Sequence, residues 1–346
     1  DRATWNSMVE LGWAAIPWGE EHGGLAFGYK GLGVVTEESG RTLTASPLYA
    51  SVWVGGTVIN VGGSDEQKND LLPKVAAGEL LLALALEESH RHNPYNIATT
   101  ATASGGGYSL SGSKTFVLDG NVADHLIVVA RSSGDTNSRD GISLFLVDAK
   151  SDGVSVTRTI MADSRNAANV TLANVSVGAN TLIGKLGEGA DTLDAALDIA
   201  RIGLSAEMLG GLQECFERTV DYLKERKQFG VAIGSFQALK HRAADMFCEI
   251  ELSKSCVLEA LTALDEGRDG DEIAKLASLA KTKVGETYNL GAGDPQSVNR
   301  LVELLGGGVV YIPKRPGEPD CTWADIAKIT RDLNWAPAIS FEEGVG

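Results

Sequence analysis

The feature that most constrains the fold is a long helical run, DTLDAALDIARIGLSAEMLGGLQECFERTVDYLKERKQ, which extends from Asp191 to Gln228. Its apolar residues recur at the three- and four-residue spacing of one helix face, so the run predicts a long amphipathic helix. Two further runs, SFQALKHRAADMFCEIELSKSCVLEALTALDEG and DEIAKLASLAKTKVGETYNL, have the same pattern, and Ser235 is the expected N-cap of the first. Long antiparallel helices of this kind pack as a bundle.

The chain before this run predicts a helical part followed by a β-part. Up to about Glu79 the apolar residues again have helical spacing, and Ser64 and Gln67 match a capping box. From about Leu80 the chain turns to short runs rich in Val, Thr and Leu, such as DHLIVVAR and ISLFLVDA, with a hairpin turn at SGGGY. These runs predict an antiparallel sheet or small barrel between two helical layers.

The predicted fold class is therefore α+β. After Leu290 the sequence pattern changes. There GAGDPQ breaks the helical pattern, and VNRLVELLGG, VVYIP and ADIAKITRDLNW predict a short helix, a strand and another helix. Because the chain starts at Asp1 without Met and already within a helical pattern, we expect that its true start is missing. The predicted domains are an N-terminal helical domain (1–81), a middle antiparallel β-domain (82–185), an incomplete C-terminal helical bundle (186–286) and a short mixed α/β tail (287–346).

Composition excludes some classes of function. The formal net charge of −16 argues against nonspecific binding to nucleic acid or anionic membranes, which needs excess Lys and Arg. No apolar run approaches the ~18 residues of a membrane span, and no signal peptide is visible, so we expect a cytoplasmic protein. The cysteines at 215, 248, 256 and 321 form no CxxC pair and predict reduced, buried thiols.

The most specific motif is KERKQFGVAIGSFQALKHRAADM, which begins at Lys224. Taken alone, it describes a surface Arg226 at a helix end, with Phe229 and Phe236 packed beneath a loop. However, it resembles the signature of the acyl-CoA dehydrogenase family, in which an Arg-x-Gln-Phe-Gly loop precedes a Phe-Gln or His-Gln helix start. The segments GWAAIPWGEEHGGLAFG, DEQKNDLLPKVAAGE and GYSLSGSKTFVLDGNVADHLIVVAR resemble other parts of that family.

The resemblance covers about residues 1–286 and implies flavin adenine dinucleotide (FAD) as cofactor. It also implies an acyl-CoA substrate, an electron-transfer partner, and a homodimer or homotetramer. In that family Arg226, Phe229 and Gln237 would contact the adenylate and pyrophosphate of a cofactor held mainly by the partner subunit. A guanidinium suits this role because it can donate to two phosphate oxygens at once.

The resemblance implies a second set of cofactor contacts on the β-part. Leu86 and Glu87 would lie on the strand whose backbone hydrogen-bonds the edge of the flavin ring. Phe116, Val117 and Leu118 align with the family's Trp-Ile-Thr, which faces the ring. Phe keeps a planar apolar wall there, whereas Leu118 replaces a hydroxyl residue that would hydrogen-bond the flavin.

The reaction of this family needs one carboxylate base, and the sequence does not locate it. One family position for this Glu immediately precedes an Arg on the long helix, and here Ala200 precedes Arg201. The other lies in a C-terminal segment that is replaced in this chain. EESHRHNP also replaces the family's TEPGAGSD loop, but His90 and His92 lack a third ligand, so we expect no metal.

The C-terminal segment from about 285 to 346 resembles the end of extended short-chain dehydrogenases that act as nucleotide-sugar epimerases. In that family Arg315 would lie near the sugar nucleotide, but the chain has no glycine-rich dinucleotide turn and no Tyr-x-x-x-Lys motif. We therefore expect a hybrid chain with a seam near Gly285 to Leu290. Four alternatives to an active dehydrogenase stay open: a noncatalytic flavin- or acyl-CoA-binding subunit, an inactive hybrid, a nucleotide-sugar enzyme, and an oxidase or monooxygenase of the same fold.

Overall fold

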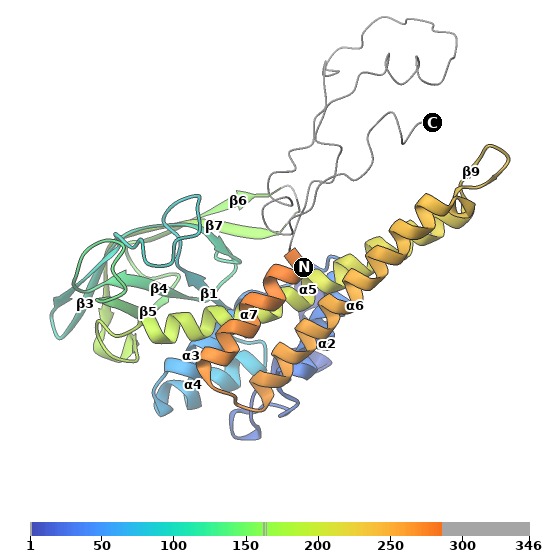
Figure 1. Cartoon of the computed structure of the whole chain (residues 1–346). Helices are drawn as coiled ribbons and strands as arrows, with labels where there is room; N and C mark the ends of the chain where they lie inside the picture. Colours follow the sequence, from blue (N-terminus) through green and yellow to red (C-terminus); the bar gives the residue numbers. More distant parts are fainter. Residues whose placement is uncertain (1, 162, 164, 286–346) are drawn as a thin grey trace, which may run out of the picture. The chain divides into compact units, whose positions relative to one another are not determined.

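The helices, the sheet and the long C-terminal helices follow one another along the chain in the order that the sequence predicts (Figure 1). This computed structural model describes residues 2–161, 163 and 165–285, so the predicted tail over 287–346 lies outside the described residues. In the described part, no helix is both long enough and apolar enough to cross a membrane.

The N-terminal part consists of short helices, and the C-terminal part of three long ones. The N-terminal elements are α1 (Arg2–Glu10), the 3₁₀ helices η1 (Trp13–Ala15) and η2 (Glu20–His22), α2 (Gly28–Arg41), the π-helix η3 (Tyr49–Gly56), α3 (Thr57–Gly62) and α4 (Asp65–Ala76). The long helices are α5 (Ala190–Glu225), α6 (Gln237–Asp265) and α7 (Gly270–Gly285), with a hairpin, β9 (Lys227–Gln228) and β10 (Val231–Ala232), and the 3₁₀ helix η5 (Ile233–Ser235) between α5 and α6.

The middle part is a mixed sheet, which corrects the prediction of a purely antiparallel sheet or barrel. Its strands are β1 (Leu82–Ala85), β2 (Thr100–Ser104), β3 (Gly107–Leu118), β4 (His125–Arg131), β5 (Ile142–Asp148), β6 (Val154–Ile160), β7 (Asn166–Gly178) and, after the 3₁₀ helix η4 (Ala179–Thr181), β8 (Leu182–Ile183). Within the described residues the order is β6-β7-β3-β2-β4-β5-β8, with β1 paired to β4. Most pairs are antiparallel, but β1 runs parallel to β4 because the β2–β3 hairpin intervenes between them along the chain.

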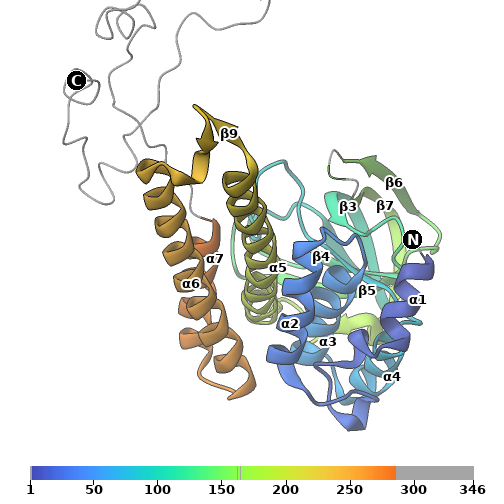
Figure 2. The ribbon, with the colours of Figure 1, turned by 90° about the vertical axis from the view of Figure 1, so that its right-hand side faces the viewer.

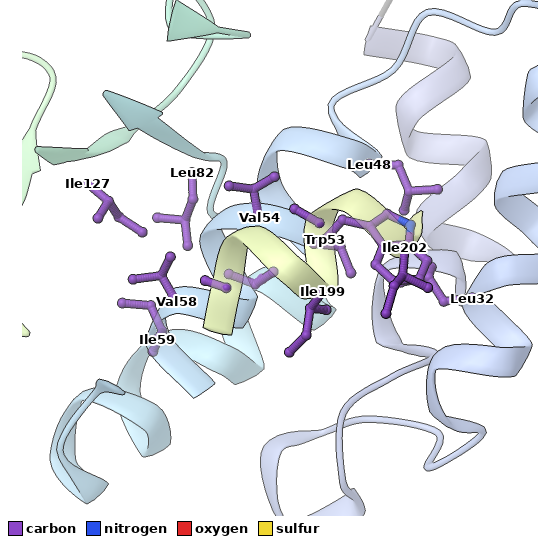
Figure 3. Packing of buried hydrophobic residues seen from close by; sticks show 14 of the residues in the cluster. Leu32, Leu48, Trp53, Val54, Val58, Ile59, Leu82, Ile127, Ile199 and Ile202 are labelled. Atoms are coloured by element: carbon purple, nitrogen blue, oxygen red, sulfur yellow. The ribbon is translucent and has the colours of Figure 1, made fainter. Parts of the chain in front are cut away.

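The central strands are buried on both faces, which explains their nearly continuous apolar sequences. On β4, Ile127 and Val129 belong to a core shared with the helices, whereas Leu126 and Val128 belong to a second core on the other face of the sheet. Figure 3 shows the first core, where Ile127 and Leu82 of the sheet face Val58 and neighbouring helical residues. Alternation along each strand therefore divides its side chains between two cores.

Helices α2 and α5 approach so closely that only glycine fits at their crossing. A Cβ atom on Gly40 would lie 1.9 Å from the carbonyl oxygen of Glu207, and one on Gly210 would lie 1.8 Å from that of Glu37. The backbones themselves are therefore in contact. Further along α5, Gly203 leaves room for the ring of Trp53, a fully buried residue of η3. A Cβ atom on Gly203 would lie only 2.4 Å from that ring.

The structure confirms one sequence prediction about individual side chains and corrects two others. The hydroxyl of Ser64 accepts from Gln67 N at 3.2 Å while the Gln67 side chain accepts from Ser64 N, so the capping box is confirmed. Ser235, in contrast, donates to the Ala232 carbonyl, and Phe236 occupies the N-cap of α6. The thiols of Cys215 and Cys248 are exposed rather than buried, because both lie on the distal half of the α5–α6 pair, which α7 is too short to cover (Figure 2).

We predict opposite effects of alanine at two adjacent glycines of α5. Gly210→Ala should lower the free energy of unfolding by about 1–3 kcal/mol, because the new methyl group meets backbone atoms of α2. Gly211→Ala should raise it by up to about 1 kcal/mol, because a Cβ there lies 3.7 Å from its nearest neighbour and alanine favours the helix. Urea unfolding of both variants measures the difference, and equal effects would contradict the close crossing.

Candidate active site

The structure brings together the predicted flavin contacts on the β-part. Leu86 and Glu87 follow directly after β1 rather than lying on it, which corrects their predicted placement. The carbonyl of Glu87 accepts from Thr115 N at 2.8 Å, and the carbonyl of Leu86 accepts from Lys114 Nζ at 3.1 Å. The segment after β1 is therefore bound side by side to the end of β3, where Phe116 lies.

A buried ion pair stabilises the segment after β1. The sequence analysis did not predict this pair. The ammonium group of Lys114 is fully buried and lies 2.7 Å from a carboxylate oxygen of Glu88. The same carboxylate accepts from the backbone N–H groups of Ala98 and Thr99. Burial lowers the pKa of Lys114 to about 8, and Glu88 opposes this shift. Although burial alone would raise it, the pKa of Glu88 is below its ordinary value because of Lys114 and these donors.

The end of β3 contains a bulge that turns Phe116 outward. Its register against β7 shifts between Lys114 and Val117, and Phe116 has a left-handed backbone with φ of 54°. The Phe116 side chain is 53% exposed, whereas Val117 is buried in the second core. A bulge re-aims side chains in this way. Any ligand against this face would meet the Phe116 ring, but only the backbone of Val117.

The other predicted contacts lie on the hairpin between α5 and α6. Arg226 is the C-cap of α5 and Gln237 begins α6, with Phe229 at the hairpin tip. The Phe229 side chain is 93% exposed, and its ring lies edge-on to Phe236 at a centroid distance of 6.1 Å. Among the described residues, the Arg226 guanidinium has no carboxylate partner. The hairpin thus presents an unpaired cation beside an exposed aromatic ring.

The two sets of predicted contacts do not meet within one chain. In Figure 1 the hairpin lies at the far end of α5 and α6, away from the sheet. A cofactor that touches both Phe116 and Arg226 would therefore need one of them from a second chain.

Asp119 is a buried carboxyl group beside the bulge that the sequence did not single out. It follows Leu118, has φ of 55°, and is 7% exposed. Burial raises its pKa to about 6, and the Asn166 side chain and the Arg165 charge counteract only part of this shift. A small cavity of about 20 Å³ adjoins it, with room for about one water molecule. The lining residues are Ala45, Ser46, Tyr49, Leu118, Asp119, Arg165 and Asn166.

Two of the residues that line this cavity also contact the middle of α5. Tyr49 lines it and donates its hydroxyl to the carbonyl of Ala200 at 2.9 Å. Arg165 lines it as well and pairs with Glu207 of α5. The sequence shows only that Asp119 follows a predicted strand. It does not predict that Asp119 is buried, because this burial depends on packing against helices that are distant in sequence.

The histidines of the 88–96 loop make no metal cluster in the described part of the chain. His92 Nδ1 lies 2.5 Å from Glu87 Oε1, and Glu87 Oε2 accepts from Asn93 N at 3.3 Å. The Glu87 side chain is therefore already engaged by the loop.

Comparison with known proteins identifies the family. Models for the N-terminal, middle and C-terminal domains of acyl-CoA dehydrogenase match residues 1–79, 83–175 and 187–319. The chain is 33% identical to the acyl-CoA dehydrogenase of Bacillus subtilis over 333 residues, which cover 94% of this chain and 85% of that protein. It is 32% identical to the 3-(aryl)acrylate reductase of Clostridium sporogenes over 308 residues, 87% of this chain and 78% of the reductase.

A solved structure described as the FAD complex of PigA matches with a TM-score of 0.74 and 26% identity, covering 82% of this chain and 77% of that one. The chain belongs to the acyl-CoA dehydrogenase family, whose cofactor is FAD. The C-terminal match runs to residue 319 and so includes the first part of the segment for which the sequence predicts an epimerase-like tail. That epimerase resemblance and the predicted seam stay predictions.

The raised pKa of Asp119 yields a prediction about stability. The folded-state pKa of Asp119, about 6, exceeds the ordinary value of 3.8, so the folded chain favours the protonated acid. The free energy of unfolding therefore falls as the pH rises from about 3.8 to about 6. At pH 8 the charged carboxylate should cost up to about 3 kcal/mol, which Asp119→Asn removes. We expect this variant to be more stable than the original chain at pH 8 and equally stable near pH 4, measured by thermal unfolding across pH. An identical pH dependence in both proteins would refute the assignment.

Proposed function

We propose that this chain binds FAD and oxidises the Cα–Cβ bond of an acyl-CoA thioester. The observation that supports this most strongly is the exposed Phe116 ring on its bulge, bound side by side to the segment after β1 and supported by the buried Lys114–Glu88 pair. A rigid aromatic and backbone surface of this kind fits a planar ring. Arg226, which has no carboxylate partner in the part of the chain that the structure describes, lies on the same hairpin as the exposed Phe229 and fits a diphosphate with an adjacent base.

The chain's residues have separate tasks in this proposal. Phe116 and the backbone at Leu86 and Glu87 orient the ring, and Arg226 neutralises the diphosphate from a second chain. FAD, when bound, supplies the acceptor for a hydride from the β-carbon. The chain must supply a group that removes the α-proton, because both electrons of that C–H bond remain to form the double bond.

The position on α5 that carries a Glu in some members of the family holds no base in this chain. Ala200 is 4% exposed and packs in the helical core, so a carboxylate is lacking there. This observation favours a second candidate function, a noncatalytic flavin- or acyl-CoA-binding subunit. The nucleotide-sugar alternative rests on residues such as Arg315, outside the described range. A homodimer or homotetramer, an electron-transfer partner and a cytoplasmic location complete the proposal as expectations from the family resemblance.

The visible absorption spectrum of the purified chain, before and after anaerobic addition of butyryl-, octanoyl- and palmitoyl-CoA, tests the proposal. Oxidised flavin that bleaches supports the dehydrogenase, whereas flavin that binds but stays oxidised with every thioester favours the noncatalytic subunit. Absence of bound flavin in a folded chain supplied with FAD would refute the dehydrogenase and the flavin-binding subunit.

Removal of the Arg226 charge should weaken FAD binding specifically. Loss of charge-assisted hydrogen bonds worth about 1.5–3 kcal/mol predicts an affinity about 10–100 times lower for Arg226→Ala, measured by FAD titration. Arg218→Ala is the matched control, because Arg218 lies on the same helix and, among the described residues, forms its ion pair with Glu214. Equal affinities of the two variants would exclude Arg226 from the cofactor site.

A further inference from the structure

The loop between β1 and β2 joins the two sides of the proposed active site. On the sheet side, the carbonyl of Glu87 accepts from the N–H of the residue before Phe116 at 2.8 Å. On the helix side, the hydroxyl of Tyr95 donates to the Asp194 carboxylate of α5 at 2.7 Å. Asp194 lies about 9 Å along the helix axis from Ala200, the position that lacks a base. The loop therefore runs from the proposed ring-facing surface to that part of α5.

Within this loop, His92 and Glu87 form a hydrogen-bonded pair. His92 Nδ1 lies 2.5 Å from Glu87 Oε1. Because an ionised carboxylate can only accept, the proton of the neutral imidazole lies on Nδ1, and the lone pair lies on Nε2. Nε2 has no hydrogen bond among the described residues, and the His92 side chain is 58% exposed. The pair thus presents an accessible nitrogen that can accept a proton.

The Glu87 carboxylate is held where it can orient this ring. Its side chain is 20% exposed, and Oε2 accepts from Asn93 N at 3.3 Å while Oε1 faces the imidazole. A carboxylate on Nδ1 fixes the tautomer of a histidine and stabilises the imidazolium that forms when Nε2 takes up a proton, as in the catalytic triad of serine proteases. Histidine is also the side chain that most often acts as a general base.

Carboxyl groups elsewhere in this region are less suited to the role of base. Glu88 accepts from the buried ammonium of Lys114 and from two backbone N–H groups, which stabilise it as the anion. Asp198 on α5 pairs with Arg201. Asp119 is buried beside space for about one water molecule and is too enclosed to contact a thioester. The imidazole combines a free acceptor atom with exposure, which none of these three carboxyl groups does.

We propose that His92 is the catalytic base of this chain and takes up the α-proton of the acyl thioester on Nε2, with Glu87 as its positioning residue. This inference rests on the proposed dehydrogenase function. The α-C–H bond breaks, its proton forms a bond to Nε2 of His92, and its electron pair becomes the new double bond. The β-hydrogen leaves with its own electron pair for FAD, so the thioester is oxidised and FAD is reduced. The imidazolium that results is paired with the Glu87 carboxylate.

The test compares His92→Ala with His90→Ala in the FAD-loaded chain. His90 is the matched control, because it lies on the same loop, is exposed and has no hydrogen bond among the described residues. His92→Ala should slow two processes about 100-fold or more: anaerobic flavin reduction by butyryl-, octanoyl- or palmitoyl-CoA, and exchange of α-deuterium of the thioester with water. Free imidazole should restore part of both rates, since the exposed site leaves room for it. His90→Ala should change neither rate.

A third variant tests the role of Glu87. Glu87→Gln keeps an acceptor oxygen for the ring but loses the charge that stabilises the imidazolium. It should slow flavin reduction at least about 10-fold, while the thioester concentration at half-saturation and the FAD occupancy stay unchanged. A weaker half-saturation at an unchanged maximal rate would show that Glu87 serves binding instead.

The outcomes separate this inference from the function on which it rests. An original chain that binds flavin but neither reduces it nor exchanges α-deuterium would overturn the dehydrogenase function and the base together. An active original chain with an equally active His92→Ala, or with slower flavin reduction but unchanged α-deuterium exchange, would overturn only the base. Loss of flavin in His92→Ala, or rates that free imidazole does not raise, would also overturn it, because the defect would then lie in the structure of the loop.

Discussion

The arrangement of the helices depends on the contact between the backbones of α2 and α5. Gly40 and Gly210 leave no room for side chains at this crossing, so the distance between the two helices is fixed by main-chain atoms that cannot adjust their shape. The N-terminus of α2 is fixed as well, because the Asp265 carboxylate at the end of α6 accepts from Tyr29 N and Lys30 N. These contacts set the path of α5, and α5 in turn determines where the Ala200 face and the distal hairpin lie.

The buried Lys114–Glu88 pair has a different task. Ion pairs in a protein interior often contribute little net stability, because desolvation offsets the attraction. This pair, however, also engages the carbonyl of Leu86 and the N–H groups of Ala98 and Thr99. The pair thereby connects three segments of the chain, those that contain Glu88, Ala98 and Lys114. Apolar side chains could not replace these hydrogen bonds. We interpret it as a fixed support behind the bulge that exposes Phe116.

Local patterns predicted the long helices and the capping box at Ser64 because period and capping chemistry are properties of neighbouring residues. The parallel placement of β1 was not predictable in this way, because it depends on which strand lies beside it. The basicity of Asp119 could not be predicted either, since it arises from burial by remote helices. The resemblance supplied Arg226 and Phe229 as site residues, whereas local physics alone predicted an ordinary helix end with a packed ring. The structure shows Phe229 fully exposed instead.

The separation of Phe116 from Arg226 has a thermodynamic consequence for the proposed cofactor. A ligand that bridges two chains binds the associated form and not the free one, so its binding and the association of chains are linked. The linkage is reciprocal: the factor by which association strengthens FAD binding equals the factor by which FAD strengthens association. The exposed Phe229 ring would gain burial in the same step. In the proposed arrangement, cofactor affinity would be a property of the assembly, and dilution of the protein would release FAD even where every contact residue is intact.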